Sequence, residues 1–232
     1  IFTLSRVMPG DPVRLALGPE ATQAQVEAMR HEMGLDLPLP LQYVRYVRGL
    51  LVGDWGQSLK TNRNVLDDLR DFFPATFELT TLAMLIAVFL GVPLGVISAI
   101  RRNKWQDQAS MVLALSGVAL PQFWLGIMLQ IVFAYIFRLL PPIGRTAVQP
   151  ADITGMVLLD SLITLNGAAL VDGLRHIILP AFALSLGTLA QITRLTRSNM
   201  VGEMRKDYVL AARAYGVPES IVVYKYMLKN AF

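Results

Sequence analysis

The sequence predicts an all-α protein that crosses a membrane several times. Of its 232 residues, 54% are hydrophobic and 16% are charged, with a mean hydropathy of +0.48, which is too apolar for an ordinary soluble domain. Asp, Glu, Lys and Arg are absent from residues 79–100, 108–137 and 176–193. Each stretch has about 18 residues or more, the length at which a spanning helix is expected. Soluble buried helices are the alternative, but they would need a larger covering shell than the remaining residues could build.

Helices are expected rather than strands because hydrocarbon offers no partner for an unpaired backbone N–H or C=O group. Residues 1–8 are interpreted as the end of a first spanning helix. The chain starts without methionine and stops at Phe232 within an amphipathic pattern, so we expect it to be truncated at both ends.

Residues 9–73 are expected to form a folded external segment. Thr22 and Gln25 have the spacing of a capping box, and Gly34 can end the helix that they start. Apolar residues at 26, 29 and 33 would share one face of that helix. Packing is the favoured role of this segment, and docking of an external partner is the alternative.

A second short helix is predicted over residues 41–51, after Pro38 and Pro40. The run Gly-Asp-Trp-Gly at 53–56 predicts a turn after it.

The charges of the connecting loops predict the orientation of the spans. Residues 101–105 carry three basic residues and no acid, and short basic loops stay in the cytoplasm. Spans over about 74–100, 107–140 and 175–198 would then run inward, outward and inward again. The basic segment 199–232 falls in the cytoplasm by the same rule.

Residues 141–174 are then an external loop. Residues 153–171 are apolar enough to suggest another span, but Asp160 would stand in its middle, at a cost of about 3 kcal/mol on insertion scales. We therefore expect short helices at the outer face.

Individual residues in the spans have a structural and a functional interpretation. Pro93, Pro121 and Pro180 could be hinges, although proline is also tolerated in membrane helices for packing. Gly91 and Gly95 have the spacing that lets a neighbouring helix approach closely.

Two titratable residues are expected near the outer ends of spans. His176 is interpreted as a snorkelling or capping residue in preference to a nickel ligand, since His31 is the only other histidine and has no suitable spacing. Glu78 is interpreted as a solvated carboxylate in preference to a site for a peptide amine.

The most informative segment is residues 207–219, Asp-Tyr-Val-Leu-Ala-Ala-Arg-Ala-Tyr-Gly-Val-Pro-Glu. Asp207 could cap a helix, Gly216 could take a left-handed position after it, and Pro218 could open the next helix. The alanines leave the surface of this helix shallow, so that the groove of another protein could approach its backbone. We expect contact with a partner at residues Asp207, Tyr208, Ala211, Ala212, Arg213, Ala214, Gly216, Pro218 and Glu219.

This segment resembles the EAA loop of ABC importer permeases, whose short coupling helix inserts into a cleft of the ATPase subunit. Further runs occur in the order seen in dipeptide, oligopeptide and nickel permeases, and the resemblance covers essentially the whole chain. These runs are Met8 to Pro12, Gly53 to Leu59, Phe73 to Leu79, Pro121 to Gly126, Leu174 to Ala181 and Arg194 to Met200. Tyr215 and Tyr226 stand where many members have lysine and histidine.

The resemblance implies a type I ABC importer transmembrane fold over residues 74–232 that lacks the family's last two spans. It implies a prokaryotic plasma (inner) membrane protein that forms half of a pathway for di- or oligopeptides, with nickel or glutathione as alternative cargo. The implied partners are a homologous second permease, two cytoplasmic ATPases that bind ATP and magnesium, and an external substrate-binding protein, within a lipid bilayer and without nucleic acid.

Three rival classes have less support in the residues. A secondary transporter would need ionisable groups deep in the spans, where Gln130 is the most polar residue of the second. An intramembrane enzyme would need a nucleophile and a base, yet no cysteine and no hydrolase or zinc-protease motif occurs. A membrane anchor would need neither the external segment nor the loop.

No Gly-Lys pair occurs, so no P-loop is present and the chain is not expected to be an enzyme itself. The sequence indicates no cofactor or metal site in this chain. It identifies neither the substrate nor the residues that line the pathway.

Overall fold

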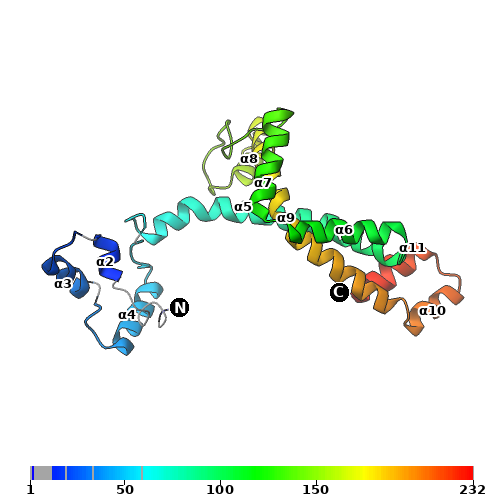
Figure 1. Cartoon of the computed structure of the whole chain (residues 1–232), viewed down its shortest axis with the longest axis horizontal. Helices are drawn as coiled ribbons and strands as arrows, with labels where there is room; N and C mark the ends of the chain where they lie inside the picture. The colour runs from blue at the N-terminus through cyan, green and yellow to red at the C-terminus, as the bar shows by residue number, and fades with distance from the viewer. Residues whose placement is uncertain (1, 3–11, 19, 33, 59, 232) are drawn as a thin grey trace. The chain divides into compact units, whose positions relative to one another are not determined.

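The computed structural model describes residues 2, 12–18, 20–32, 34–58 and 60–231. Over these residues its regular secondary structure is helical, joined by turns and loops, apart from one isolated antiparallel bridge between Gln57 and Asn64 (Figure 1). Apart from residue 2, the predicted end of a spanning helix at 1–8 lies outside these residues, as do most of the run from Met8 to Pro12 and Met33. The described elements are α2 Pro12–Leu17, α3 Gln23–Glu32, α4 Leu39–Leu51, α5 Val65–Ile100, α6 Trp105–Ala119, α7 Gln122–Gln130, η1 Ile131–Ile136, α8 Val157–Ile163, α9 Gly167–Glu203, α10 Asp207–Ala214, α11 Glu219–Ile221, η2 Val222–Leu228 and α12 Lys229–Ala231.

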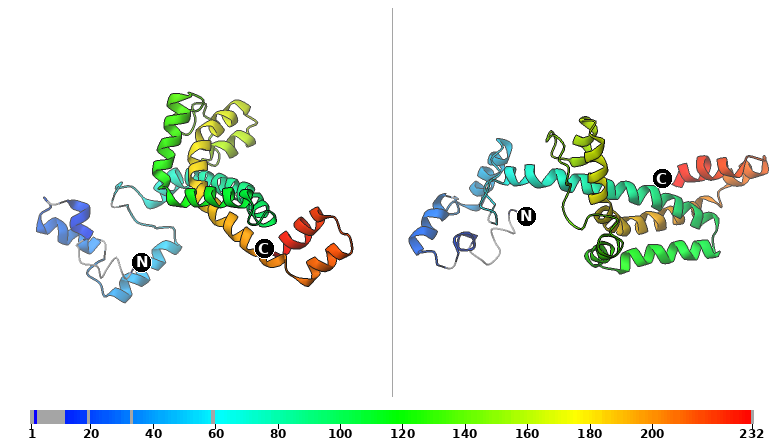
Figure 2. Two further views of the ribbon diagram at one scale, coloured as in Figure 1. Left: turned by 45° about the vertical axis from the view of Figure 1, so that its right-hand side comes forward. Right: turned by 90° about the horizontal axis from the view of Figure 1, so that it is seen from above.

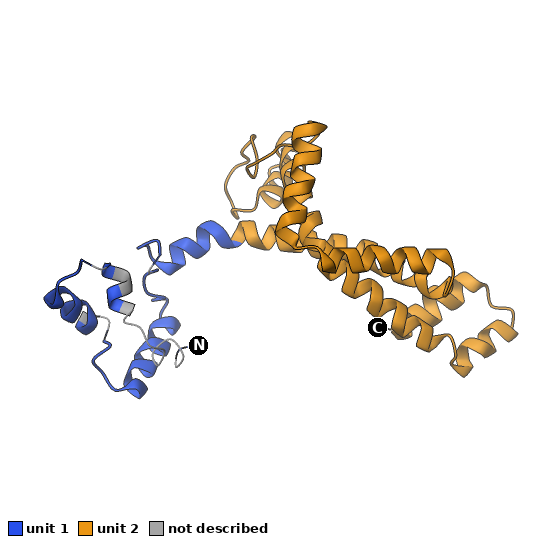
Figure 3. Cartoon of the chain, in the orientation of Figure 1, with its two compact units in different colours: residues 1–73 blue, residues 74–232 orange. Residues whose placement is uncertain are grey.

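The chain divides into two compact units, residues 1–73 and residues 74–232 (Figure 3). In the first unit the predicted capping box is present. The backbone N–H of Thr22 donates to Oε1 of Gln25 at 2.9 Å, and the N–H of Gln25 lies 3.4 Å from Oγ1 of Thr22. Gly34, with φ +64°, follows the end of α3 as expected.

The helix predicted to start at Leu41 begins two residues earlier. Pro40 lies in the first turn of α4, where its missing N–H removes no intrahelical hydrogen bond. The turn at 53–56 is present, with the N–H of Gly56 donating to Oδ1 of Asp54 at 3.1 Å.

In the second unit α9 is the central element, and it packs against α6, α7 and α8 (Figure 2). Two helices, α5 and α9, are long and apolar enough to cross a membrane. Counting α6, α7 and η1 together as one bent span gives a third. Both long helices exceed the roughly 20 residues that a bilayer requires, so parts of each extend beyond the hydrocarbon.

The close approach expected at Gly91 and Gly95 is a contact between α5 and α9. A Cβ atom on Gly95 would lie 2.6 Å from Cβ of Thr196, and one on Gly91 would lie 3.0 Å from Cγ2 of Ile192. Oγ1 of Thr193 also donates to the carbonyl of Gly91 at 3.2 Å. The two glycines therefore allow the two backbones to approach closely enough for a hydrogen bond between the helices.

The stretch expected as one continuous span over 107–140 is broken. α6 ends at Ala119, α7 starts at Gln122, and the two are bent by 102°. Leu120 has φ −89° and ψ 135°, an extended conformation that the ring of Pro121 favours by disfavouring the helical conformation of the residue before it. Pro74 and Pro93 lie inside α5, and Pro180 lies inside α9, without ending the helix.

Short helical structure occurs in 141–174 as α8, but α9 begins at Gly167, earlier than the span expected at 175. Asn166 is the N-cap of α9, and its side chain accepts from the N–H of Ala169 at 3.1 Å. Asp160 is 2% exposed and is held by Thr154, whose N–H and Oγ1 lie 3.0 and 2.7 Å from Oδ1.

Candidate functional site

The predicted coupling residues lie on a compact hairpin formed by α10, a turn and α11 with η2, here called the 207–228 hairpin. Gly216 has φ +75°, and the backbone N–H of Val217 donates to the carbonyl of Ala212 at 3.0 Å. This is the left-handed helix end that the sequence predicts. Pro218, with φ −52°, precedes α11.

The hairpin is fixed to the long helices by an apolar core. Val209 of α10 is fully buried and belongs to one cluster with Val96 of α5, Met200 of α9 and Met227 of η2. Ala212 is partly buried against the same cluster, so its contribution is at least partly to this packing.

The opposite side of α10 is exposed. Ala211, Arg213 and Ala214 are exposed, Leu210 is 53% exposed and Tyr215 is 86% exposed. The alanines therefore leave a low surface between two protruding apolar side chains. The sequence did not lead us to expect Leu210 or Tyr215 among the contact residues. A large side chain that stands among alanines and charged residues could have indicated such a contact.

Arg213 and Glu219 close the hairpin. Nη2 and Nε of Arg213 donate to the two carboxylate oxygens of Glu219 at 2.6 and 3.1 Å. The hydrogen bond from Arg213 is the main reason that the pKa of Glu219 is lowered from its ordinary value. Both residues are thus engaged with each other across the turn, and both side chains are also partly exposed.

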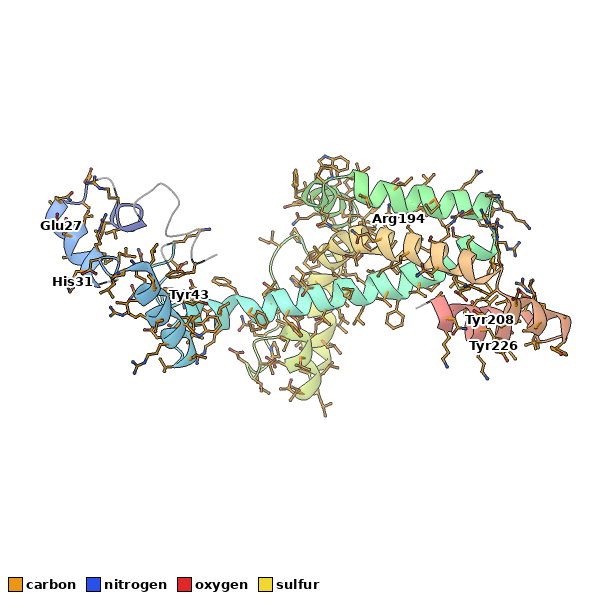
Figure 4. All side chains as sticks on the ribbon, turned by 90° about the horizontal axis from the view of Figure 1, so that it is seen from below. Glu27, His31, Tyr43, Arg194, Tyr208 and Tyr226 are labelled. Carbon is orange, nitrogen blue, oxygen red and sulfur yellow. The ribbon has the colours of Figure 1, made fainter. Side chains whose placement is uncertain are left out.

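The expectation that Asp207 caps α10 is wrong. Lys206 occupies the N-cap position and makes no side-chain capping bond, while Asp207 is the first residue of the helix. Its charge there still complements the helix dipole. Tyr208 donates to Glu203, and burial together with that bond raises the pKa of the phenol; Figure 4 shows Tyr208 and Tyr226 at this end of the chain.

A second polar cluster, which sequence reasoning missed, lies at the start of α6. Asp107 accepts two bonds from Arg197 of α9, at 2.6 and 2.7 Å, and one from the N–H of Asn103 at 2.9 Å. Ser98 also donates to Asp107. Asp107 and Arg197 are 90 positions apart in the sequence, which explains why no local pattern shows this pair.

Glu78 and His176 line a cavity of about 200 Å³ together with residues of α5, α8, α9 and the 141–156 loop. Contrary to expectation, Glu78 is not solvated: its side chain is 9% exposed, and it accepts from the N–H groups of Val157 and Leu158 at the start of α8. The side chain of His176 is 7% exposed rather than snorkelling, and its Nδ1 donates to the carbonyl of Asp172 at 2.8 Å. No cluster of three metal-ligating side chains occurs among the residues that the structure describes.

Comparison with known families covers nearly the whole chain. Residues 91–232 match the family described as binding-protein-dependent transport system inner membrane component, and residues 1–80 match its N-terminal region. This chain belongs to that permease family. The permease is 42% identical over 99% of its length to the probable D,D-dipeptide transport system permease protein DdpB of Escherichia coli strain K12, and it covers 68% of that protein.

Two further relatives span the permease at similar identity. A di/tripeptide transport system permease protein of Pseudomonas aeruginosa is 39% identical over 99% of the chain, which covers 69% of that relative. The glutathione transport system permease protein GsiC of Escherichia coli strain K12 is 36% identical over the whole chain, which covers 67% of that protein. The permease is thus an integral membrane subunit of an ABC importer and works within a complex with other subunits.

Proposed function

We propose that this permease forms half of a pathway for di- or oligopeptides across the prokaryotic inner membrane, and that the 207–228 hairpin transmits the action of a cytoplasmic ATPase. The observation that carries the proposal is the build of the hairpin. Its inner side is anchored in the core through Val209, and its outer side presents Ala211, Ala214 and Tyr215 to solvent.

A surface of this kind suits docking into a groove. Small side chains let a partner's groove approach the helix backbone, and an exposed aromatic side chain such as Tyr215 can fill a pocket at the centre of the contact. The buried side ensures that a force on the hairpin moves the long helices with it. ATP and magnesium would be bound by the partner ATPases, because this chain has no P-loop sequence.

The complete assembly in this proposal also contains a homologous second permease and an external substrate-binding protein. Peptide cargo is supported by the names of the dipeptide and di/tripeptide relatives, each matching nearly the whole chain. Glutathione, itself a tripeptide, is the second candidate because a glutathione permease also matches throughout.

The hairpin is tested with two single variants, Ala211→Glu and Gly216→Pro. Ala211→Glu places a long charged side chain on the exposed surface without touching the core, so we expect co-purification of the ATPase to fall at least tenfold. Gly216→Pro cannot take the φ of +75° that the turn requires, so substrate-stimulated ATP hydrolysis should also be lost.

The matched control is Ala151→Glu, which adds the same side chain at an exposed position of the 141–156 loop. It should leave co-purification unchanged. Normal ATPase binding and stimulated hydrolysis in both hairpin variants would show that the hairpin is only a surface turn.

Cargo is tested separately, by uptake into proteoliposomes containing the complete importer. Accumulation of a labelled dipeptide supports the peptide proposal, and accumulation of glutathione alone supports the second candidate. Uptake of nickel without either would overturn both.

A further inference from the structure

Asp107 joins three separate parts of the second unit. Its carboxylate accepts from Ser98 in the last turn of α5, from the N–H of Asn103 in the α5–α6 turn, and from Arg197 in α9. The side chain of Asp107 is 6% exposed. A buried carboxylate is stable only when its charge and lone pairs are satisfied in this way.

The bond with Arg197 constrains direction as well as distance. Nε donates to Oδ1 at 2.6 Å and Nη2 donates to Oδ2 at 2.7 Å. Two parallel bonds between planar groups hold only over a narrow range of angles. Sliding or rotation of α6 against α9 would therefore break both bonds and leave a buried charge unpaired.

The pair lies next to the apolar core that anchors the hairpin. Met200, three residues after Arg197 on α9, is fully buried in the same cluster as Val209 of α10 and Ala99 of α5. Val209 thus ties α10 to α9, and Arg197 ties α9 to α6 less than one helical turn away.

We infer that Arg197 and Asp107 are positioning residues that make the start of α6, the end of α9 and the 207–228 hairpin move as one body. This inference rests on the proposed coupling function. A displacement of the hairpin is then carried to α6 and to the sharp bend at Leu120 and Pro121 that follows it. Packing alone, such as that of Gly117 against Leu186, is the competing way to connect α6 with α9.

The first measurement compares Arg197→Gln with Arg194→Gln in the complete importer in lipid nanodiscs. Arg194 lies one turn earlier on α9 and is exposed (Figure 4), so its variant removes the same charge without touching Asp107. For Arg197→Gln we expect substrate-stimulated ATP hydrolysis to fall at least tenfold, while ATPase co-purification and basal hydrolysis stay within twofold of wild type. Arg194→Gln should resemble wild type in all three.

A distance measurement separates transmission of movement from stability alone. The chain contains no cysteine, so spin labels can be attached at Val112→Cys on α6 and Lys225→Cys on η2, both exposed positions. In the wild-type background, adding ATP should leave the distance between the labels unchanged. In Arg197→Gln, ATP should shift or broaden it.

Each outcome of these two measurements either supports or overturns the inference. Stimulated hydrolysis and label distances like wild type in Arg197→Gln would overturn the inference and favour packing. If that variant fails to assemble, Arg197→Lys takes its place, because lysine retains the positive charge but cannot form the two parallel hydrogen bonds with Asp107. Arg197→Lys should assemble and should show at least a threefold loss of substrate-stimulated ATP hydrolysis. Full stimulation in this variant would overturn the inference. Absence of ATPase binding in the wild type would refute the proposed function. The label distances measured without ATP then still test the single body, which requires a broader distribution in Arg197→Gln than in the wild-type background.

Discussion

Gly95 of α5 and Thr196 of α9 lie so close that a Cβ atom on the glycine would be 2.6 Å from Cβ of the threonine. The carbonyl oxygen of Thr193 would lie only 2.8 Å from the same atom. Because a backbone oxygen cannot rotate away as a side chain can, any larger residue at this position must push the helices apart.

Gly95→Ala is therefore expected to destabilise the permease by about 1–3 kcal/mol, the usual cost of overpacking. Thermal unfolding in detergent measures this as a lower melting temperature. Gly167→Ala is the control, since nothing lies within 4 Å of a Cβ atom there. Equal melting temperatures for the two variants would contradict the close contact.

Glu78→Ala should loosen the start of α8. Glu78 accepts from the N–H groups of Val157 and Leu158, and leaving such groups unsatisfied costs about 1–3 kcal/mol. Amide hydrogen exchange should become faster over residues 153–163. Glu78→Gln retains one carbonyl acceptor and should give an intermediate rate; unchanged exchange in Glu78→Ala would refute the capping role.

Asp160→Asn tests whether the carboxyl of Asp160 makes the stability of the fold depend on pH. Burial raises the pKa of Asp160, but hydrogen bonds from Thr154, Ile153 and Gly155 outweigh it, and the pKa is lowered from the ordinary value of 3.8. A carboxyl whose pKa is lower when folded stabilises the fold above its ordinary pKa, and that contribution is lost as the pH falls through the lowered value. Wild type should thus exceed Asp160→Asn in melting temperature at pH 6, and the gap should narrow below about pH 4. A gap that is constant from pH 6 to pH 3 would show that the charge contributes nothing.

Gly216→Ala should cost about 1–2 kcal/mol through the backbone alone, because φ is +75° and no atom lies within 4 Å of the added Cβ. Gly216→Asn should cost less, since asparagine tolerates this conformation better. Gly202→Ala, in the α9 helix and also facing open space, should instead be neutral or stabilising. Thermal unfolding of the three variants supplies the comparison, and equal behaviour of Gly216→Ala and Gly202→Ala would contradict the left-handed turn.

Local signals were sufficient for some elements. The capping box at Thr22 and Gln25, the helix end at Gly34 and the turn at Gly216 all depend on residues a few positions apart, and each is present in the structure. The helical character of the apolar stretches likewise follows from backbone hydrogen bonding in an apolar medium.

Features that depend on contacts between distant segments were not predictable in this way. Pro93 and Pro180 stay inside helices, whereas Pro121 lies in the break between α6 and α7, where the chain bends by 102°. The local chemistry of the proline ring is the same in all three. The partners of Glu78 are Arg145, 67 residues away, and two backbone N–H groups 79 and 80 residues away, so the sequence alone suggested a solvated carboxylate. Sidedness of the spans and the role of the hairpin residues remain predictions.

The unbroken course of α9 has a mechanical consequence. With 37 residues it is about 55 Å long, and it runs from the cap at Asn166 to a point three residues before α10. A hydrogen-bonded helix resists torsion, so twisting one end turns the other, and Pro180, which lacks one of those bonds, is its softest point. The loop around α8 and the 207–228 hairpin therefore share one torsional degree of freedom, and stiffening either end restricts the angles open to the other.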